Sequence, residues 1–288
     1  MAASNIYGWD GSFAYYLVAD TIFGPYKPTN EMQVMPGSEQ DYAHISQTGF
    51  FYTVRGSEQE TVLFCGDRWA EFAGNGLGYN QWVPLSFDGE TPYFNSLHSW
   101  KLNEATGTWS VAADNNYIKN PSFEADRRHI PSNNKPVQEQ LLGWHTEILQ
   151  GNPISTTDPD SPVLNHFNTQ NDRQHVIGEK SLHISDQVPF ERRITQELSS
   201  TPYVSLPDGK YRLSATVKNT TGFEELNLYS QSGTQTFKTS FNTSNPEWTT
   251  ITIDEVSVVN GNVTIGIHAK GAAGATAWVD DVRFELLD

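Results

Sequence analysis

The chain has 288 residues, of which 37% are hydrophobic, so it can bury one or two sizeable cores. Its formal net charge is −16, and both halves are acidic. Residues 1–116 contain 4 Lys and Arg and 13 Asp and Glu, and the rest of the chain contains 14 Lys and Arg and 21 Asp and Glu. Such a field repels polyanions at long range. It argues against nucleic acids and anionic membrane surfaces as partners, and it does not penalise an uncharged sugar.

The cysteine content and the hydropathy pattern exclude further classes. Cys65 is the only cysteine, which rules out an intrachain disulfide and a multi-cysteine metal site. It lies in the apolar run 61–65, where we expect a buried strand residue. No apolar run approaches the roughly 20 residues of a membrane span. No signal peptide is visible at the N-terminus, so we expect any export signal to lie outside this sequence.

The first half of the chain is predicted to be all-β, because no segment carries a convincing helical stripe. Asp88-Gly89 is a hairpin signal. Several strands in about 110 residues could form a small barrel, a sandwich or about two blades of a β-propeller. Two blades alone would expose their flanking faces, because blades cover one another. The predicted strands are 13–19, 50–54, 61–65 and 82–87, after which the segments 100–102 and 105–109 close this half.

A change in composition divides the chain near residue 115. The small, polar run 112–116 precedes the segment 117–126, which we predict to be the opening or edge strand of a second domain. Pro121 removes a backbone donor and biases Asn120 towards an extended conformation. We therefore place the domain boundary between residues 1–114 and 115–288.

The second half is predicted to be a β-sandwich. Alternation is clear in several segments: Leu213, Ala215 and Val217 share one face, and so do Val263, Ile265 and Ile267. Turn signals such as Pro207-Asp208-Gly209 separate these segments. One apolar face on each strand implies two packed sheets. The predicted strands are 181–185, 192–197, 210–217, 226–229, 249–253, 263–268 and 278–284.

The first half carries motifs of a known family. In order, they are Ser4 to Trp9, Thr21 to Tyr26, Ser46-Gln47-Thr48, Gly66-Asp67-Arg68-Trp69 and Trp82-Val83-Pro84-Leu85. This part resembles the C-terminal third of the five-bladed propeller of glycoside hydrolase family 43, nearest its exo-β-1,3-galactanase branch. The resemblance implies an inverting hydrolase in which Gln47 takes the place of the usual base. It also implies that the acidic partners belong to upstream blades that this chain lacks.

This resemblance sets expectations for activity. Local carboxylates such as Asp10, Asp20 and Glu71 show no spacing that would pair them, so we expect the chain alone to have no appreciable glycosidase activity. Trp9 is a candidate for stacking on a sugar ring, with a core position as its alternative.

The second half also carries a family's motifs, in the order Asn120 to Glu124, Gly143-Trp144, Gly178 to Leu182, Asp208 to Tyr211 and Val279 to Val282. It resembles the jelly-roll carbohydrate-binding modules of the family 4 and 9 type. The resemblance implies a structural calcium held by Glu124 and Asp280, with backbone oxygens such as those of Ser122 and Lys180. Oxygen ligands suit a hard cation. The alternative is that both carboxylates bond nearby backbone amides.

Polar residues alternate with the apolar faces of the predicted sandwich. Arg212, Asn227, Tyr229 and His268 are candidates for a sugar-binding groove with one aromatic platform. Planar rings stack on the apolar faces of sugars, while amides and guanidinium groups bond their hydroxyls. An ordinary solvated sheet face is the alternative.

Three classes of function remain open. The first is the C-terminal part of a glycoside hydrolase that acts on β-1,3-galactan-like side chains of plant polysaccharides. The second is a non-catalytic glycan-binding or cell-surface attachment protein. The third is an adhesion or assembly protein without a sugar ligand, because such sandwiches serve many roles. A polysaccharide partner implies an extracellular, periplasmic or cell-surface location.

Overall fold

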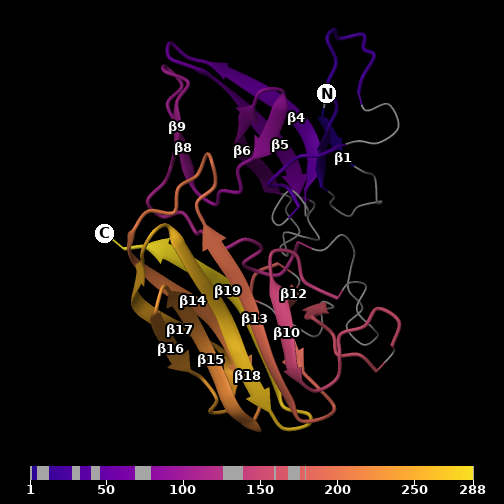
Figure 1. Ribbon diagram of the computed structural model, residues 1–288, viewed down its shortest axis with the longest axis vertical. Coiled ribbons are helices and arrows are strands. Elements are labelled where there is room, and N and C mark those ends of the chain that lie inside the picture. The colour runs from indigo at the N-terminus through magenta and orange to yellow at the C-terminus, as the bar shows by residue number, and fades with distance from the viewer. Residues whose placement is uncertain are drawn as a thin grey trace. The chain divides into compact units, whose positions relative to one another are not determined.

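The computed structural model describes residues 2–4, 13–27, 33–39, 46–68, 79–125, 139–158, 160–167, 176–178 and 180–287. Every long regular element among them is a β-strand, which confirms the predicted all-β class (Figure 1). No described helix is long and apolar enough to cross a membrane. The described residues form two compact units, one up to Asn115 and one from Asn116, except that Ala125 groups with the first.

The first unit contains a four-stranded antiparallel meander. β4 (Gln47–Arg55), β5 (Glu60–Arg68), β6 (Tyr79–Asp88) and β7 (Thr91–Phe94) pair in chain order, which is the form of one propeller blade. The β6–β7 hairpin turns at Gly89 and Glu90, one residue after the predicted signal, and Gly89 has a φ of 59°. β1 (Ala2–Ser4), β2 (Ala14–Tyr16) and β3 (Gln33–Val34) form a second sheet, and β8 (Trp100–Leu102) pairs with β9 (Trp109–Val111).

The meander is apolar on both faces. On one face, Phe64 packs edge-on against Phe94 with ring centroids 5.2 Å apart, within a core that also contains residues of β2 and β6. On the other face, Phe50, Tyr52 and Trp82 are 53%, 58% and 46% exposed. Cys65 lies between Phe50 and Trp82 in the register and is buried, as predicted. A sheet with two apolar faces is expected to be covered on both.

The second unit is a sandwich of two five-stranded antiparallel sheets. One sheet has the order β10-β13-β18-β15-β16 and the other β11-β12-β19-β14-β17. Their bounds are β10 (His145–Gln150), β11 (Asn165–Phe167), β12 (Lys180–Ser185), β13 (Phe190–Ser199), β14 (Gly209–Asn219), β15 (Phe223–Ser232), β16 (Gln235–Ser240), β17 (Asn245–Val258), β18 (Asn262–Gly271) and β19 (Thr276–Leu286). Figure 1 shows β10 and β12 in pink and the later strands, from β13 to β19, in orange to yellow.

The sandwich core is filled by the alternating residues that the sequence placed on apolar faces. Leu213, Ala215 and Val217 of β14 meet Val263 and Ile265 of β18 in one buried cluster. Tyr211 of β14 stacks on Phe284 of β19, with centroids 4.6 Å apart and rings within 2° of parallel. Because both sheets contribute one face to this core, their outer faces are left for other contacts.

The segment that opens the second unit runs beside β19 but is not a regular strand. The backbone N–H of Val282 donates to the carbonyl of Pro121 at 3.0 Å, and the Asn116 side-chain oxygen accepts the N–H of Phe284 at 2.9 Å. The prediction that Asn120 is extended is wrong, because its φ is 48°. The prediction of a strand in this segment is also wrong. Asn tolerates this region, and the Asn120 amide and carbonyl are held by Leu142 and the Trp144 indole.

Candidate functional site on the outer face of a sandwich sheet

Three of the predicted sugar-binding residues lie together on one sheet. Asn227 and Tyr229 are on β15, and His268 is on the adjacent strand β18. In the register, His268 is opposite Asn227, and Tyr229 is opposite Gly266. Directly opposed residues of antiparallel strands share a face, so all three side chains belong to the outer face of the β10-β13-β18-β15-β16 sheet.

Gly266 makes room for the ring of Tyr229. A Cβ at position 266 would lie 3.1 Å from Tyr229 Cε1 and 3.0 Å from the methyl carbon of Thr195 on β13. The ring therefore reaches from β15 across β18 towards β13, over the position that has no side chain. A half-buried aromatic ring that lies along a sheet is a platform on which a sugar can stack.

A polar network adjoins this platform. His268 Nε2 is 2.9 Å from Glu191 Oε1, and His268 Nδ1 is 3.5 Å from Glu225 Oε2. The amide of Asn227 donates to the same Glu225 oxygen at 3.2 Å. These four side chains come from β13, β18 and β15, and they place carboxylate, imidazole and amide groups in one row beside the ring.

Charged groups surround the hydroxyl end of Tyr229. Arg193 on β13 pairs with Glu147 on β10 at 3.5 Å. Burial raises the pKa of the Tyr229 hydroxyl, the positive charge of Arg193 lowers it, and the negative charge of Glu147 raises it. The ring extends over Gly266 towards β13, and Arg193 and Glu147 lie on β13 and β10, the two strands on that side of β18.

Arg212 does not join this face. It lies on β14 of the other sheet, opposite Glu285 of β19, and its Nε donates to Asp254 Oδ1 at 2.7 Å. Alternation assigns a residue to the inner or outer face of its own strand, and it does not say which sheet that strand enters. The four predicted residues therefore divide between two sheets.

The two carboxylates predicted to bind calcium are both fully buried. Asp280 Oδ2 accepts the backbone N–H groups of Val176 and Ile177 at 2.6 and 2.9 Å, and its Oδ1 accepts that of Asp281 at 2.7 Å. Glu124 Oε1 accepts the N–H of Lys180 at 2.6 Å. The expected alternative, bonding to nearby amides, is thus present in the structure.

The donor set also fits a hard cation. Burial raises the pKa of Asp280 well above its usual range, the backbone N–H groups lower it, and the charge of Glu124 raises it further. Two carboxyl groups that repel each other in a buried place favour a bound cation or a proton. Ser122 and Lys180 are buried there as well. Among the described residues, no three His, Cys, Asp or Glu side chains are placed to hold a metal ion, so further ligands from this part of the chain would be neutral oxygens.

The predicted catalytic residue lies in the first unit. Gln47 is the first residue of β4, half-buried, and it is opposite Asp67 of β5 in the register. Strand pairing therefore places the carboxylate of Asp67 next to Gln47. Trp9 lies outside the described residues.

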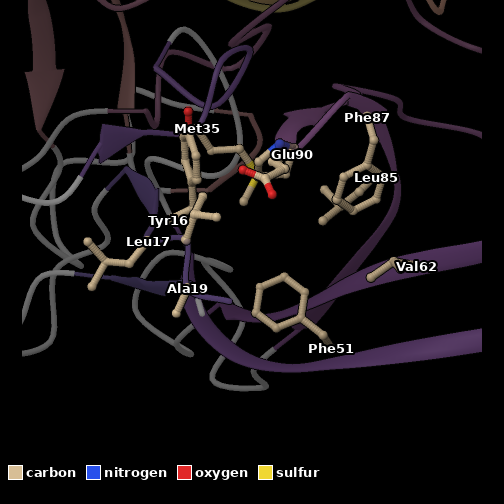
Figure 2. A pocket seen from close by; sticks show the side chains of 11 residues that line it. Tyr16, Leu17, Ala19, Met35, Phe51, Val62, Leu85, Phe87 and Glu90 are labelled. Carbon is tan, nitrogen blue, oxygen red and sulfur yellow. The ribbon is translucent and has the colours of Figure 1, made fainter. Parts of the chain in front are cut away.

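A pocket of about 350 Å³ lies in the first unit, on the face opposite Phe50 and Trp82. Figure 2 shows Phe51, Val62 and Leu85 along its wall, from β4, β5 and β6. Glu90 is the only carboxylate among the described residues of the lining, whereas glycoside hydrolysis commonly uses a pair of acids. The lining residues are Tyr16, Leu17, Val18, Ala19, Met35, Phe51, Val62, Leu85, Phe87, Glu90 and Pro92.

Sequence patterns alone miss several members of the outer face. Glu147, Glu191 and Arg193 lie on β10 and β13, and they join Tyr229 and His268 only through strand pairing. Gly266 interrupts the otherwise alternating segment 263–268, and this interruption is the one local signal of a close approach.

No family model and no curated protein matches the sequence. Among solved structures, the chain is similar to a family 61 carbohydrate-binding module in complex with β-1,4-galactotriose, at 20% identity over 60% of this chain and 99% of that one, with a TM-score of 0.44. It is also similar to an exo-β-1,3-galactanase from Phanerochaete chrysosporium with galactose, at 17% identity over 96% of this chain, with a TM-score of 0.34. The chain spans about half, 53%, of that enzyme. These remote likenesses assign neither a family nor a ligand.

Proposed function

We propose that the second unit is a carbohydrate-binding module, and that it binds an uncharged glycan on the outer face of the β10-β13-β18-β15-β16 sheet. The observation that carries this proposal is the Tyr229 ring over Gly266, with the row of Glu191, His268, Glu225 and Asn227 beside it. An aromatic ring next to several hydrogen-bonding groups suits a ligand with one apolar face and many hydroxyls.

Charge supports an uncharged ligand over a polyanion. The chain carries a net charge of −16, and carboxylates outnumber cationic side chains around the platform. A polysaccharide ligand would be met outside the cytoplasm, so we propose an extracellular, periplasmic or cell-surface location. The glycan to test first is a β-galactan.

For the first unit, we propose a piece of a larger glycoside hydrolase propeller. Phe50, Tyr52 and Trp82 form an exposed aromatic surface on the meander, and such a surface is typical of a face that another sheet covers. Gln47 would then be one member of a catalytic site whose acids lie on other blades. A non-catalytic attachment protein is the second candidate, because the aromatic and polar outer face of the second unit would serve it equally well.

We also propose that Glu124 and Asp280 hold a structural calcium ion together with backbone oxygens of Ser122 and Lys180. The ion would offset the repulsion between two buried carboxylates and would tie the segment before β10 to β19. Its binding would stabilise the folded state by about 2.7 kcal/mol at a calcium concentration one hundred times the Kd. A thermal midpoint at pH 7 that is equal in excess calcium and in chelator would contradict this site.

The binding proposal is tested by a screen of the 288-residue protein against neutral plant polysaccharides. β-1,3-Galactan, β-1,4-galactan, xylan and mixed-linkage β-glucan would each be cast in a native gel, with calcium and with chelator. We expect at least one of them to retard the protein. Mobility that is unchanged with every polysaccharide would overturn the binding function. Release of galactose from β-1,3-galactan in parallel samples would overturn the expectation that the chain is inactive alone.

A further inference from the structure

The polar network and the Tyr229 ring occupy neighbouring rows of the same sheet. His268 follows Gly266 by two residues on β18, so the two positions are about 7 Å apart on one face. Glu191 is on β13 and Glu225 is on β15, the strands on either side of β18. A pyranose ring stacked on Tyr229 would therefore have its rim at the level of this network.

His268 lies between the two carboxylates, and each of its ring nitrogens faces one of them. The Nε2–Oε1 distance to Glu191 is 2.9 Å, and the Nδ1–Oε2 distance to Glu225 is 3.5 Å. The side chains of His268, Glu191 and Glu225 are 18%, 26% and 44% exposed. The imidazole is thus the most buried of the three, and the carboxylates lie nearer the solvent.

Only one oxygen of each carboxylate takes part in these contacts. Glu225 Oε2 receives the Asn227 amide and faces His268, which leaves Glu225 Oε1 outside the network, and Glu191 Oε2 is likewise not used in it. A carboxylate accepts through both oxygens. Bonds from sugar hydroxyls to such oxygens are charge-assisted and stronger than neutral ones.

We propose that Tyr229, Glu191 and Glu225 form one subsite for a single uncharged sugar residue, and that His268 is the positioning residue of this subsite. The ring of Tyr229 stacks on the sugar, and the outer oxygens of Glu191 and Glu225 accept its hydroxyl hydrogens. The half-buried imidazole holds both carboxylates in place. This inference rests on the proposed glycan-binding function.

The same carboxylates make the subsite selective against acidic sugars. Two of the nearby cations are engaged, because Arg193 pairs with Glu147 and Lys270 pairs with Glu224 at 2.7 Å. Lys238, opposite Tyr229 in the register, lies on β16, on the side of β15 away from β18 and the two carboxylates. A uronate in the subsite would face two carboxylates. Repulsion between two unit charges about 5 Å apart in a water-like dielectric corresponds to a factor of about four in affinity.

The test compares one polysaccharide with its own oxidised form. The 288-residue protein is titrated with neutral β-galactan, and with the same β-galactan after its primary hydroxyls have been oxidised to carboxylates. We expect the wild-type protein to prefer the neutral polymer. Glu191→Gln and Glu225→Gln should each reduce this preference by about fourfold, because each removes one negative charge and keeps the shape of the side chain.

Two further variants complete the design. Asp254→Asn makes the same charge change on the other sheet, and it should leave the preference unchanged. His268→Gln keeps one donor for a carboxylate, so it should weaken binding to neutral galactan less than His268→Leu does. The two variants should have equal thermal midpoints. If His268 were merely structural, the two variants would differ in thermal midpoint, and their affinities measured at a temperature where both are fully folded would be equal.

The outcomes separate this inference from the proposed function. If neither polymer binds the wild-type protein and the neutral screen is also blank, the glycan-binding function fails. If galactan binds and Tyr229→Ala abolishes the binding, but the preference stays the same in Glu191→Gln and Glu225→Gln, the subsite is wrong and the function survives. A reduced preference in both variants, and not in Asp254→Asn, would support the subsite.

Discussion

Arg192 and Asp186 form an ion pair inside the sandwich, with Nη2 of the arginine 2.7 Å from Oδ2 of the aspartate and both side chains at most 2% exposed. Asp186 also accepts backbone N–H groups of Asn152 and Gln187, and Arg192 Nη1 donates to the carbonyl of Ser185. Burial lowers the pKa of Arg192, and the charge of Asp186 raises it. The pair fixes the connection between β12 and β13. Glu191 lies on β13, next to Arg192.

This pair should be costly to break from one side. We expect Arg192→Met to lower the free energy of unfolding by about 3–5 kcal/mol, because it leaves the buried carboxylate of Asp186 without its counter-charge. Urea denaturation measures the change. Arg55→Met is the control, because the Arg55–Glu60 pair is exposed, and its loss should cost at most about 1 kcal/mol. Equal costs for the two variants would contradict the role assigned to the buried pair.

The turn that carries Gly178 should tolerate no side chain. Gly178 has a φ of 70°, and a Cβ there would overlap the carboxylate of Glu124. Gly274 has a φ of 80°, with nothing within 4 Å of the position of its Cβ. We expect Gly274→Ala to cost about 1–2 kcal/mol from backbone strain alone. Gly178→Ala should cost about 1–3 kcal/mol more, because it also displaces a buried, hydrogen-bonded carboxylate.

Thermal or urea denaturation of the two glycine variants checks this difference. A Gly178→Ala variant as stable as Gly274→Ala would mean that Glu124 is not packed against this turn. It would also remove one support for the calcium proposal.

Alkaline pH should weaken the first unit through Cys65. Burial raises the pKa of the Cys65 thiol, and a backbone hydrogen bond lowers it by less. A thiol whose pKa is higher in the folded state contributes stability that is full below the unfolded pKa and is lost as the pH rises through the folded value. We therefore expect no modification of the native protein by iodoacetamide at pH 8, and a fall in the thermal midpoint above about pH 9.

The Cys65→Ala variant should show a smaller fall over the same pH range, although it is less stable at pH 7. Rapid alkylation of the folded protein at pH 8 would contradict the buried, protonated thiol.

Arg212 should not contribute to glycan binding. It lies on β14 and pairs with Asp254, away from the sheet that carries Tyr229. We expect Arg212→Ala to leave the affinity for a bound polysaccharide within twofold of the wild-type value. Titration calorimetry or affinity electrophoresis measures it. A tenfold loss would show that the ligand is bound on the other sheet.

The strands of the sandwich that could be predicted from the sequence are those with a regular apolar face. β14 and β18 alternate clearly, and both are interior strands that pair with a neighbour on each side. β10 and β16 were not predicted, because they lie at sheet edges and their residues are mostly exposed and polar. An edge strand buries little on its outer side, so it leaves little pattern in the sequence.

The candidate site was predictable only in part, for a related reason. Asn227, Tyr229 and His268 were found by alternation, whereas Glu191 and Gly266 acquire their roles from the pairing of strands that are distant in the sequence. Asn120 was predicted to be extended from its proline neighbour, and its side-chain and carbonyl hydrogen bonds hold a left-handed conformation instead. Tertiary contacts decided both cases, and local sequence does not contain them.

The central claim is that the ring of Tyr229 is the platform of a glycan-binding face. The most direct measurement is the affinity of the Tyr229→Ala variant for the neutral polysaccharide that the wild-type protein binds best, compared with Tyr229→Phe. We predict that Tyr229→Ala loses at least tenfold in affinity, that Tyr229→Phe stays within about threefold, and that both keep the wild-type fold by circular dichroism. Full affinity in Tyr229→Ala would contradict it.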